Sequence, residues 1–340
     1  MSKSIWFDFS KIKKHHRAFN FVFGGRGTGK TFNAIAEQVK EQREFTFMRR
    51  TQTEIELLAS GVMGASLSPF KSVNAIKGTE LEMYRINKNV YGIRNGFDEE
   101  KSQFMGFGLA LSTVSSLRGF DGSDIKDIIF DEFVPQKDVR LIKDEGGAFL
   151  NAYETINRNR EFNGIEPVYA YLLSNSNNIS HPLITMLGLS SIIERMIKKG
   201  QTFVDLPQRN ATITMIRNES FEEKKRNTAL YQLTKGTSFY EMALHNDFAY
   251  DDFSGVRNVD LRAYTPWVMW GNIMIYRHKS ENIFFASTLI RKTRHTYGDT
   301  DSDTLRFYQD YGRTLYGLFL EHRLYFEDYA VKKKVLEVIL

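Results

Sequence analysis

The sequence contains no cysteine and only 6 prolines among 340 residues. The absence of cysteine excludes disulfides and thiolate zinc sites, and it suits a reducing compartment such as a cytoplasm. No stretch approaches the roughly 18 uninterrupted apolar residues that a membrane-spanning helix needs. The first residues also lack the apolar segment of a secretion signal. We therefore expect a cytoplasmic protein that does not act in a membrane.

A strong excess of one charge is also absent. Lysine and arginine number 46 against 41 aspartates and glutamates, which gives a net charge of +5. This mildly basic balance permits nucleic-acid binding but does not require it. A chain of 340 residues exceeds what one hydrophobic core usually serves, so we expect two domains.

Residues 24–31 read GGRGTGKT and meet the phosphate-loop pattern G-x-x-x-x-G-K-[ST]. An apolar, β-prone run (Phe19–Phe23) precedes them and an amphipathic helical pattern follows, which is the strand–loop–helix context that such a loop requires. Glycines allow backbone N–H groups to surround phosphate oxygens, and the helix N-terminus adds partial positive charge. The alternative, a chance match in a turn, is disfavoured by this context. The predicted nucleotide-binding residues are Gly24, Gly25, Arg26, Gly27, Thr28, Gly29, Lys30 and Thr31.

Within this loop, Lys30 is expected to reach the β- and γ-phosphates of ATP, and the Thr31 hydroxyl to ligate Mg²⁺. A second apolar strand is predicted at residues 128–130 and ends in Asp131 and Glu132. Asp131 is expected to hold Mg²⁺ through water, and Glu132 to act as general base on the attacking water. By itself such a pair is more often a solvated strand end. Together with the glycine loop it predicts ATP hydrolysis.

Three more strands are predicted, at residues 44–50, 105–112 and 168–175. The two that lie between the loop and the acidic pair fit P-loop proteins with an added central strand and a catalytic glutamate. The third ends in an asparagine-rich stretch, and an amide at this position could contact the γ-phosphate or the water. Asn175 is the preferred candidate and Asn177 the second, with an ordinary turn as the alternative.

Two arginines, Arg158 and Arg160, follow a predicted helix. An arginine that reaches the γ-phosphate of a neighbouring subunit would stabilise the charge that develops during transfer. Arg158 is the preferred candidate for this role. The alternative is a solvated basic helix end, where cations are also favoured. Arg26, inside the glycine loop, could contact phosphate in its own subunit.

The stretch SSLRGFDGSDIKDIIFDEF, residues 115–133, resembles the corresponding region of phage large-terminase ATPases. Together with the arginine-bearing glycine loop and the short chain, it most resembles the phi-twenty-nine-like DNA-packaging (encapsidation) ATPases of small tailed phages. The motifs that carry this resemblance lie within residues 1–205. Beyond residue 205 the resemblance is one of length and layout only.

This resemblance implies an ATP- and Mg²⁺-dependent double-stranded DNA translocase that packages a genome into a prohead at its portal vertex, in the host cytoplasm. It implies a homo-oligomeric ring, commonly a pentamer, and in some members a structural RNA. By position, Lys30 and Thr31 match the loop residues, Asp131 and Glu132 the acidic pair, and Arg158 the trans-acting arginine. Asn175 matches the coupling or sensor position.

The expected fold class is α/β. We expect a P-loop ATPase domain of the ASCE type, as in RecA-, FtsK- and terminase-like proteins, with a largely parallel sheet over residues 1–207. A helical linker is predicted at 208–239. By the terminase resemblance, a smaller RNase-H-like domain would occupy 240–340. Its predicted hairpin within 268–288 carries no acid where a nuclease would place one, so we expect a docking domain for nucleic acid or portal without nuclease activity.

Direct DNA contacts are harder to place. Two short β runs lie within residues 70–103, among several basic residues, and a hairpin or loop there could line a pore. Transport of any DNA sequence should depend on backbone charge rather than on base edges. The candidates are Lys71, Lys77 and Lys101. Two alternatives to a packaging motor stay open: another P-loop DNA pump or helicase, and a nucleotide-dependent assembly switch without motor activity.

Overall fold

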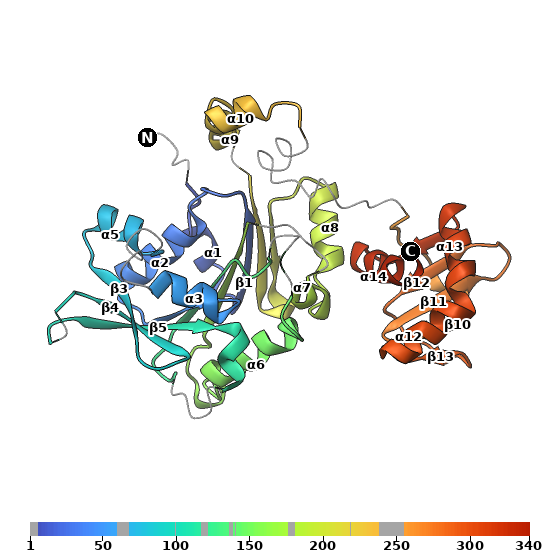
Figure 1. The fold of residues 1–340 in the computed structure, drawn as a ribbon, viewed down its shortest axis with the longest axis horizontal. Coiled ribbons are helices and arrows are strands. Elements are labelled where there is room, and N and C mark those ends of the chain that lie inside the picture. Colours follow the sequence, from blue (N-terminus) through green and yellow to red (C-terminus); the bar gives the residue numbers. More distant parts are fainter. Residues whose placement is uncertain are drawn as a thin grey trace. The chain divides into compact units, whose positions relative to one another are not determined.

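The computed structural model describes residues 6–59, 68–98, 100–116, 122–135, 139, 141–175, 181–217, 219–237 and 255–340. The chain divides into two compact units (Figure 1). The first consists of Met1–Asn178 and Gly200–Phe248, and the second of Ile179–Lys199 and Ala249–Leu340. Over these described ranges, no helix is both long and apolar enough to cross a membrane.

The first unit is built on a nine-stranded mixed sheet with the order β3-β4-β5-β2-β6-β7-β1-β9-β8. Its strands are β1 (Phe19–Gly24), β2 (Phe45–Arg49), β3 (Leu81–Arg85), β4 (Val90–Asn95), β5 (Gln103–Ala110), β6 (Asp127–Asp131), β7 (Tyr169–Ser174), β8 (Phe203–Leu206) and β9 (Ala211–Ile216). The six strands β5, β2, β6, β7, β1 and β9 pair in parallel. The remaining pairs, β3–β4, β4–β5 and β8–β9, are antiparallel. The strands expected from the sequence are confirmed, and the α/β class with them.

The parallel strands are apolar because helices cover both faces of a parallel sheet. Every residue of β6 is buried, and in β1 only the first residue is partly exposed. The helices and 3₁₀ turns of this unit are α1 (Ser10–Lys13), α2 (Lys30–Glu41), α3 (Gln52–Ala59), α5 (Lys71–Lys77), η1 (Leu111–Ser116), α6 (Glu145–Asn157), η2 (Glu161–Asn163), η3 (Pro207–Arg209), α9 (Glu219–Arg226) and α10 (Ala229–Leu233).

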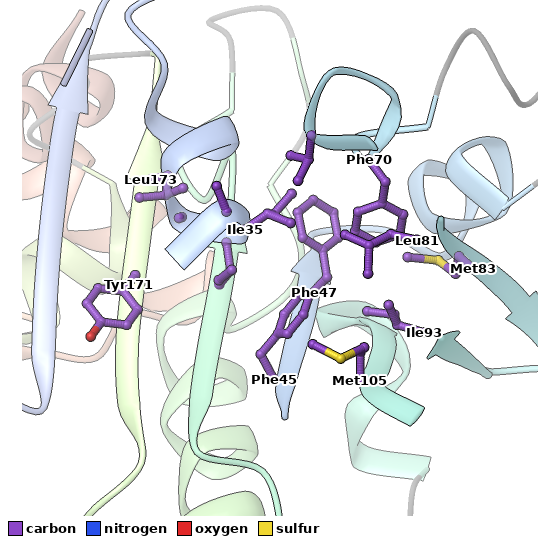
Figure 2. Packing of buried hydrophobic residues seen from close by; sticks show 14 of the residues in the cluster. Ile35, Phe45, Phe47, Phe70, Leu81, Met83, Ile93, Met105, Tyr171 and Leu173 are labelled. Atoms are coloured by element: carbon purple, nitrogen blue, oxygen red, sulfur yellow. The ribbon is translucent and has the colours of Figure 1, made fainter. Parts of the chain in front are cut away.

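On one face of the sheet, α2 packs its apolar side against the strands. Figure 2 shows Ile35 of α2 beside Phe45 and Phe47 of β2, with Phe70 and Met105 in the same cluster. All five side chains are almost completely buried. This core fixes the start of α2 against the ends of the central strands, and thereby fixes the glycine loop.

The added central strand is not one of the two that precede the acidic pair. It is β7, which follows that pair in the chain and lies between β1 and β6, in parallel with both. Sequence order did not reveal this because parallel strands are joined by crossovers, so neighbours in space need not be neighbours in sequence. As a result, the end of β7 lies between the glycine loop and the acidic pair.

The expected boundary at Pro207 and the linker from residue 208 differ from the structure. β9 begins at Ala211 and pairs with β1 along the whole strand, so it belongs to the sheet of the first unit. Among the described residues of the predicted linker, the charged segment forms α9 and the uncharged segment after it forms α10, while the 3₁₀ turn η3 lies at its start. The alternating strand pattern ATITMI was overlooked because it is short and sits beside a strongly helical sequence.

The second unit contains a five-stranded sheet with the order β13-β10-β11-β12-β14. Its elements are α7 (Pro182–Met186), α8 (Ser190–Lys198), η4 (Leu261–Ala263), β10 (Tyr264–Trp270), β11 (Ile273–His278), β12 (Phe284–Ser287), β13 (Thr296–Tyr297), α12 (Asp301–Phe307), the π-helical η5 (Tyr308–Gly312), α13 (Arg313–Leu320), β14 (Leu324–Phe326) and α14 (Tyr329–Ile339). The antiparallel β11–β12 pair confirms the predicted hairpin. Asp301 and Asp303 lie in the first turn of α12, where Asp303 N–H donates to the capping hydroxyl of Thr300.

Candidate nucleotide and catalytic site

The glycine loop connects the end of β1 to the start of α2. Gly27 and Gly29 have φ angles of 80° and 86°, a left-handed conformation that glycine adopts without steric cost. Gly29 is the N-cap of α2, and the Thr28 hydroxyl donates to Gly25 O at 3.0 Å. The loop therefore leads directly into the N-terminus of a twelve-residue helix, where free backbone N–H groups favour an anion.

Lys30 folds back over this loop. Its ammonium group donates to Gly24 O at 2.6 Å, to Gly25 O at 3.0 Å and to Asn175 Oδ1 at 2.8 Å. The residue is only 5% exposed. Burial lowers the pKa of Lys30 to about 8, although the carboxylates of Asp131 and Glu132 act in the opposite direction. A buried cation that is surrounded by neutral oxygens is well placed to meet the oxygens of a phosphate.

Thr31, the residue after Lys30 in α2, lies beside Asp131, the last residue of β6. The Thr31 hydroxyl donates to Asp131 Oδ1 at 2.7 Å. Burial raises the pKa of Asp131, while Arg49 and Thr31 oppose the rise. Hydroxyl and carboxylate oxygens are the donors that Mg²⁺ uses when phosphates complete its coordination. These two residues therefore fit the expected Mg²⁺ of a bound Mg²⁺–ATP.

Glu132 leaves β6 with a φ angle of 54°, which is unusual for a residue with a side chain. Asn175 Nδ2 donates to Glu132 Oε1 at 3.0 Å. Because the other end of the same amide accepts from Lys30, Asn175 connects the glycine loop to the candidate general base. This connection follows from the position of β7 between β1 and β6.

Arg49 was not predicted from the sequence. It ends β2, and its side chain is 15% exposed. One guanidinium nitrogen donates to Glu132 Oε2 at 2.8 Å, and another lies 3.2 Å from Asp131 Oδ2. The next residue, Arg50, pairs instead with the buried Glu145. Sequence alone could not choose between two consecutive arginines, because only the order of the strands shows that β2 lies beside β6.

The arginines proposed for a trans role differ in their surroundings. Arg158 is the exposed C-cap of α6, with a φ angle of 45°. Arg160 is 6% exposed and donates to Gly122 O at 3.2 Å and to Ser123 O at 2.5 Å. Arg160, the second choice, therefore holds the turn before β6 within its own chain, and a role for it in a neighbouring subunit stays a prediction. Arg26, in the glycine loop, is exposed.

The predicted DNA-contact residues are exposed. Lys71 and Lys77 lie at the two ends of α5, and the side chain of Lys101 is 83% exposed and lies 3.4 Å from Asp98. Their contact with DNA stays a prediction. Asn177 and residues 117–121, which include the Leu-Arg-Gly of the terminase-like stretch, lie outside the described residues.

The chain is similar in sequence and in fold to DNA packaging proteins of phages. The DNA packaging proteins of Bacillus phages phi29 and PZA are each 27% identical to this chain over 257 residues, which cover 74% of it and 68% of each relative. Two solved structures share the fold along almost the whole chain. The bacteriophage Phi-29 viral genome packaging motor assembly matches with a TM-score of 0.66 at 21% identity, covering 98% of both chains. The Phi-28 gp11 DNA packaging motor matches with a TM-score of 0.61 at 18% identity, with the same coverage.

A family model describes the larger part of the sequence. The model of the Podovirus DNA encapsidation protein (Gp16) matches residues 1–264, which include the glycine loop, the acidic pair and all nine strands of the first sheet. The resemblance to encapsidation proteins is thereby confirmed. The chain belongs to the Podovirus DNA encapsidation protein (Gp16) family.

Proposed function

We propose that this chain is the ATP-hydrolysing subunit of a phage DNA-packaging motor and that it moves double-stranded DNA into a prohead. The observation that carries the proposal is a continuous set of side-chain contacts at the carboxyl ends of β1, β2, β6 and β7. Asn175 connects Lys30 to Glu132, and Arg49 connects Glu132 to Asp131. Thr31 then joins Asp131 to the loop. The family, and the names of the relatives, supply the packaging context.

Bound Mg²⁺–ATP would supply the scissile phosphoanhydride and a metal that neutralises charge developing on the phosphates. Lys30 would exchange its contacts with loop carbonyls for contacts with phosphate oxygens. Thr31 and Asp131 would hold the metal. Glu132 would orient a water molecule and accept its proton.

Both oxygens of the Glu132 carboxylate have partners, Asn175 on Oε1 and Arg49 on Oε2. An oxygen that already accepts a hydrogen bond has one acceptor position fewer for an attacking water, so release of the Asn175 contact would open Oε1 to that water. Because Asn175 also contacts Lys30, a phosphate that attracts Lys30 would free this amide. We infer that phosphate binding and the release of Glu132 are coupled through Asn175.

Substitution of Glu132 by glutamine tests the hydrolytic role. Glu132→Gln keeps the size and the hydrogen-bonding ability of the side chain but removes its basicity. We expect ATP binding within about threefold of the natural chain and turnover reduced by about 10²–10⁴-fold. Glu100→Gln, which changes an exposed glutamate elsewhere in the first unit, should leave turnover unchanged. Normal turnover in Glu132→Gln would refute the assignment and favour a site that only binds nucleotide.

We further propose that Arg158 acts on the nucleotide of a neighbouring subunit in a homomeric ring, commonly a pentamer in this group. Its exposure at the end of α6 supports this role. A mixture of Arg158→Ala and Lys30→Ala chains should recover part of the ATPase activity that each lacks alone, because some interfaces then combine an intact loop with an intact arginine. Full activity of Arg158→Ala by itself would place the arginine elsewhere.

DNA contact by Lys71, Lys77 and Lys101, all of them exposed, is part of the same proposal. ATPase activity should be stimulated by blunt duplex DNA more than by single strands, without strand separation. A helicase would show the reverse preference.

We propose that the second unit contains an RNase-H-like domain without nuclease activity. This domain would dock onto the portal, the prohead or a structural RNA. Incubation of supercoiled DNA with Mg²⁺ or Mn²⁺ tests that claim, and nicking by the purified chain would refute it.

A further inference from the structure

Trp6 lies against the nucleotide loop although it is outside the sequence motif. The backbone N–H of the next residue, Phe7, donates to Thr28 O at 3.0 Å. A methyl group placed on the Cα of Gly29 would lie 3.4 Å from Trp6 Cβ and 3.5 Å from Trp6 Cε3. The tryptophan therefore sits at the junction between the loop and α2.

The residues after Trp6 hold it at this place. Phe7 and Phe9 pack into the core of the first unit, where the ring of Phe9 lies 4.6 Å from that of Tyr171. Asp8 accepts hydrogen bonds from the backbone N–H and the hydroxyl of Ser10. The segment that carries Trp6 is thus anchored by the buried ring of Phe9, the partly buried ring of Phe7 and the hydrogen bonds between Asp8 and Ser10.

Trp6 itself stays 49% exposed, whereas Phe9 is 3% exposed. A large aromatic side chain held beside a phosphate loop with half its surface open is suited to cover a planar group. The nucleoside of a bound triphosphate supplies such a group, because its base must lie outside the loop that holds the phosphates. Stacking of a base on an aromatic ring is favourable for every base, since each has a π face.

We propose that Trp6 stacks on the base of the nucleotide bound at Gly24–Thr31, an inference that rests on the proposed ATP site. Stacking depends on the π face of the base and not on hydrogen bonds to its edge. The Trp6 ring therefore strengthens the binding of all nucleoside triphosphates similarly. The preference for one base then has to come from other groups.

The test compares ligands with and without a base, using the full chain. Binding of Mg²⁺–ATP and of inorganic tripolyphosphate is measured by calorimetry for the natural chain, Trp6→Ala and Trp6→Phe. We expect Trp6→Ala to weaken ATP binding about tenfold and to leave tripolyphosphate binding unchanged. Trp6→Phe should retain most of the ATP affinity, because phenylalanine keeps an aromatic face. Phe162→Ala, which removes an 87% exposed ring elsewhere in the first unit, is the matched control.

Two results would overturn the proposal. If Trp6→Ala weakens ATP and tripolyphosphate equally, the side chain only shapes the loop; if it weakens neither, it makes no contact with the ligand. If the natural chain binds neither ATP nor tripolyphosphate, the nucleotide site itself is refuted, and the stacking role of Trp6 with it.

Fluorescence gives an independent measurement if Trp6→Ala does not fold. The other two tryptophans, Trp267 and Trp270, belong to the second unit. ATP, but not tripolyphosphate, should quench the emission of the natural chain, and this change should be absent from Trp6→Phe. An unchanged quench in Trp6→Phe would also overturn the proposal.

Discussion

The two ends of strand β6 carry similar residues in different surroundings. Asp127 begins the strand and pairs with Arg43, Nε to Oδ2 at 2.5 Å. Asp131 ends it and pairs with Arg49 at 3.2 Å. Both aspartates are buried, and burial raises the pKa of each against the effect of its arginine. Identity, burial and charge pairing therefore do not distinguish the two ends.

The difference lies in what the other elements bring to each end. Near Asp127 is a cavity of about 340 Å³ whose walls include Tyr169, Tyr171 and the ion pair of Lys13 with Glu41. Near Asp131 are the glycine loop, Thr31 and a second carboxylate. In a parallel sheet the carboxyl ends of all strands meet at one edge, and ligands of such folds bind there. An aspartate–arginine pair becomes a candidate site only where such groups converge.

The two aspartates of β6 should respond differently to substitution. We expect Asp131→Asn to reduce ATP turnover by about a hundredfold or more, because a metal ligand is lost. Asp127→Asn should retain turnover within about twofold. Since burial raises the pKa of Asp127, its charge does not stabilise the fold, and the free energy of unfolding should change little. Steady-state ATPase assays and thermal unfolding measure both, and equal losses would contradict the distinction.

The arginines at the two ends of β6 should differ in their effect on the pH dependence of turnover. Arg49 opposes the burial that raises the pKa of Asp131, so Arg49→Ala should raise that pKa further. Asp131 then becomes protonated, and loses its affinity for metal, at a higher pH than in the natural chain. We expect turnover at pH 7 to fall about tenfold, with the acidic limb of the pH–rate profile shifted upward.

Arg43→Ala is the matched control at the other end of the strands. It should leave the acidic limb in place, because Arg43 contacts Asp127 and not the site. If Arg49→Ala gave the same profile as the natural chain, the ion pair with Asp131 would have no part in the reaction.

The smallest expected effect concerns Lys30, whose pKa is lowered from 10.5 to about 8. In the chain without nucleotide, Lys30 is then mostly charged below about pH 8 and mostly neutral above it. A bound phosphate favours the charged form. Binding above pH 8 therefore requires proton uptake, and ATP affinity should fall about fourfold between pH 7 and 8.5. Titration calorimetry at several pH values measures this. Lys30→Arg, which stays charged, should show no such fall, and a flat profile in the natural chain would contradict the shift.

Several features could be read directly from residues. Strands β1 and β6 are apolar runs, and the residues after them match a phosphate loop and an acidic pair. The asparagine at the end of β7 was also predicted. β9 was missed because its six residues follow a 3₁₀ turn and precede a charged helix, so the segment was assigned to a linker. The surroundings of Arg160 were not evident from the sequence, because a basic residue after a helix is usually solvated, whereas here two backbone carbonyls hold it.

The sequence by itself determined the loop, the two carboxylates and the helix that begins at Lys30, because each depends on residues close together in the chain. The tertiary structure decided which distant residues join them. Insertion of β7 between β1 and β6 places Asn175 between Lys30 and Glu132. Pairing of β2 with β6 brings Arg49, rather than Arg50, to the carboxylates. Backbone hydrogen bonds between strands that are distant in the chain set the strand order, and local spacing does not encode that order. The pleat then directs consecutive side chains such as Arg49 and Arg50 to opposite faces, so only one of them reaches the carboxylates.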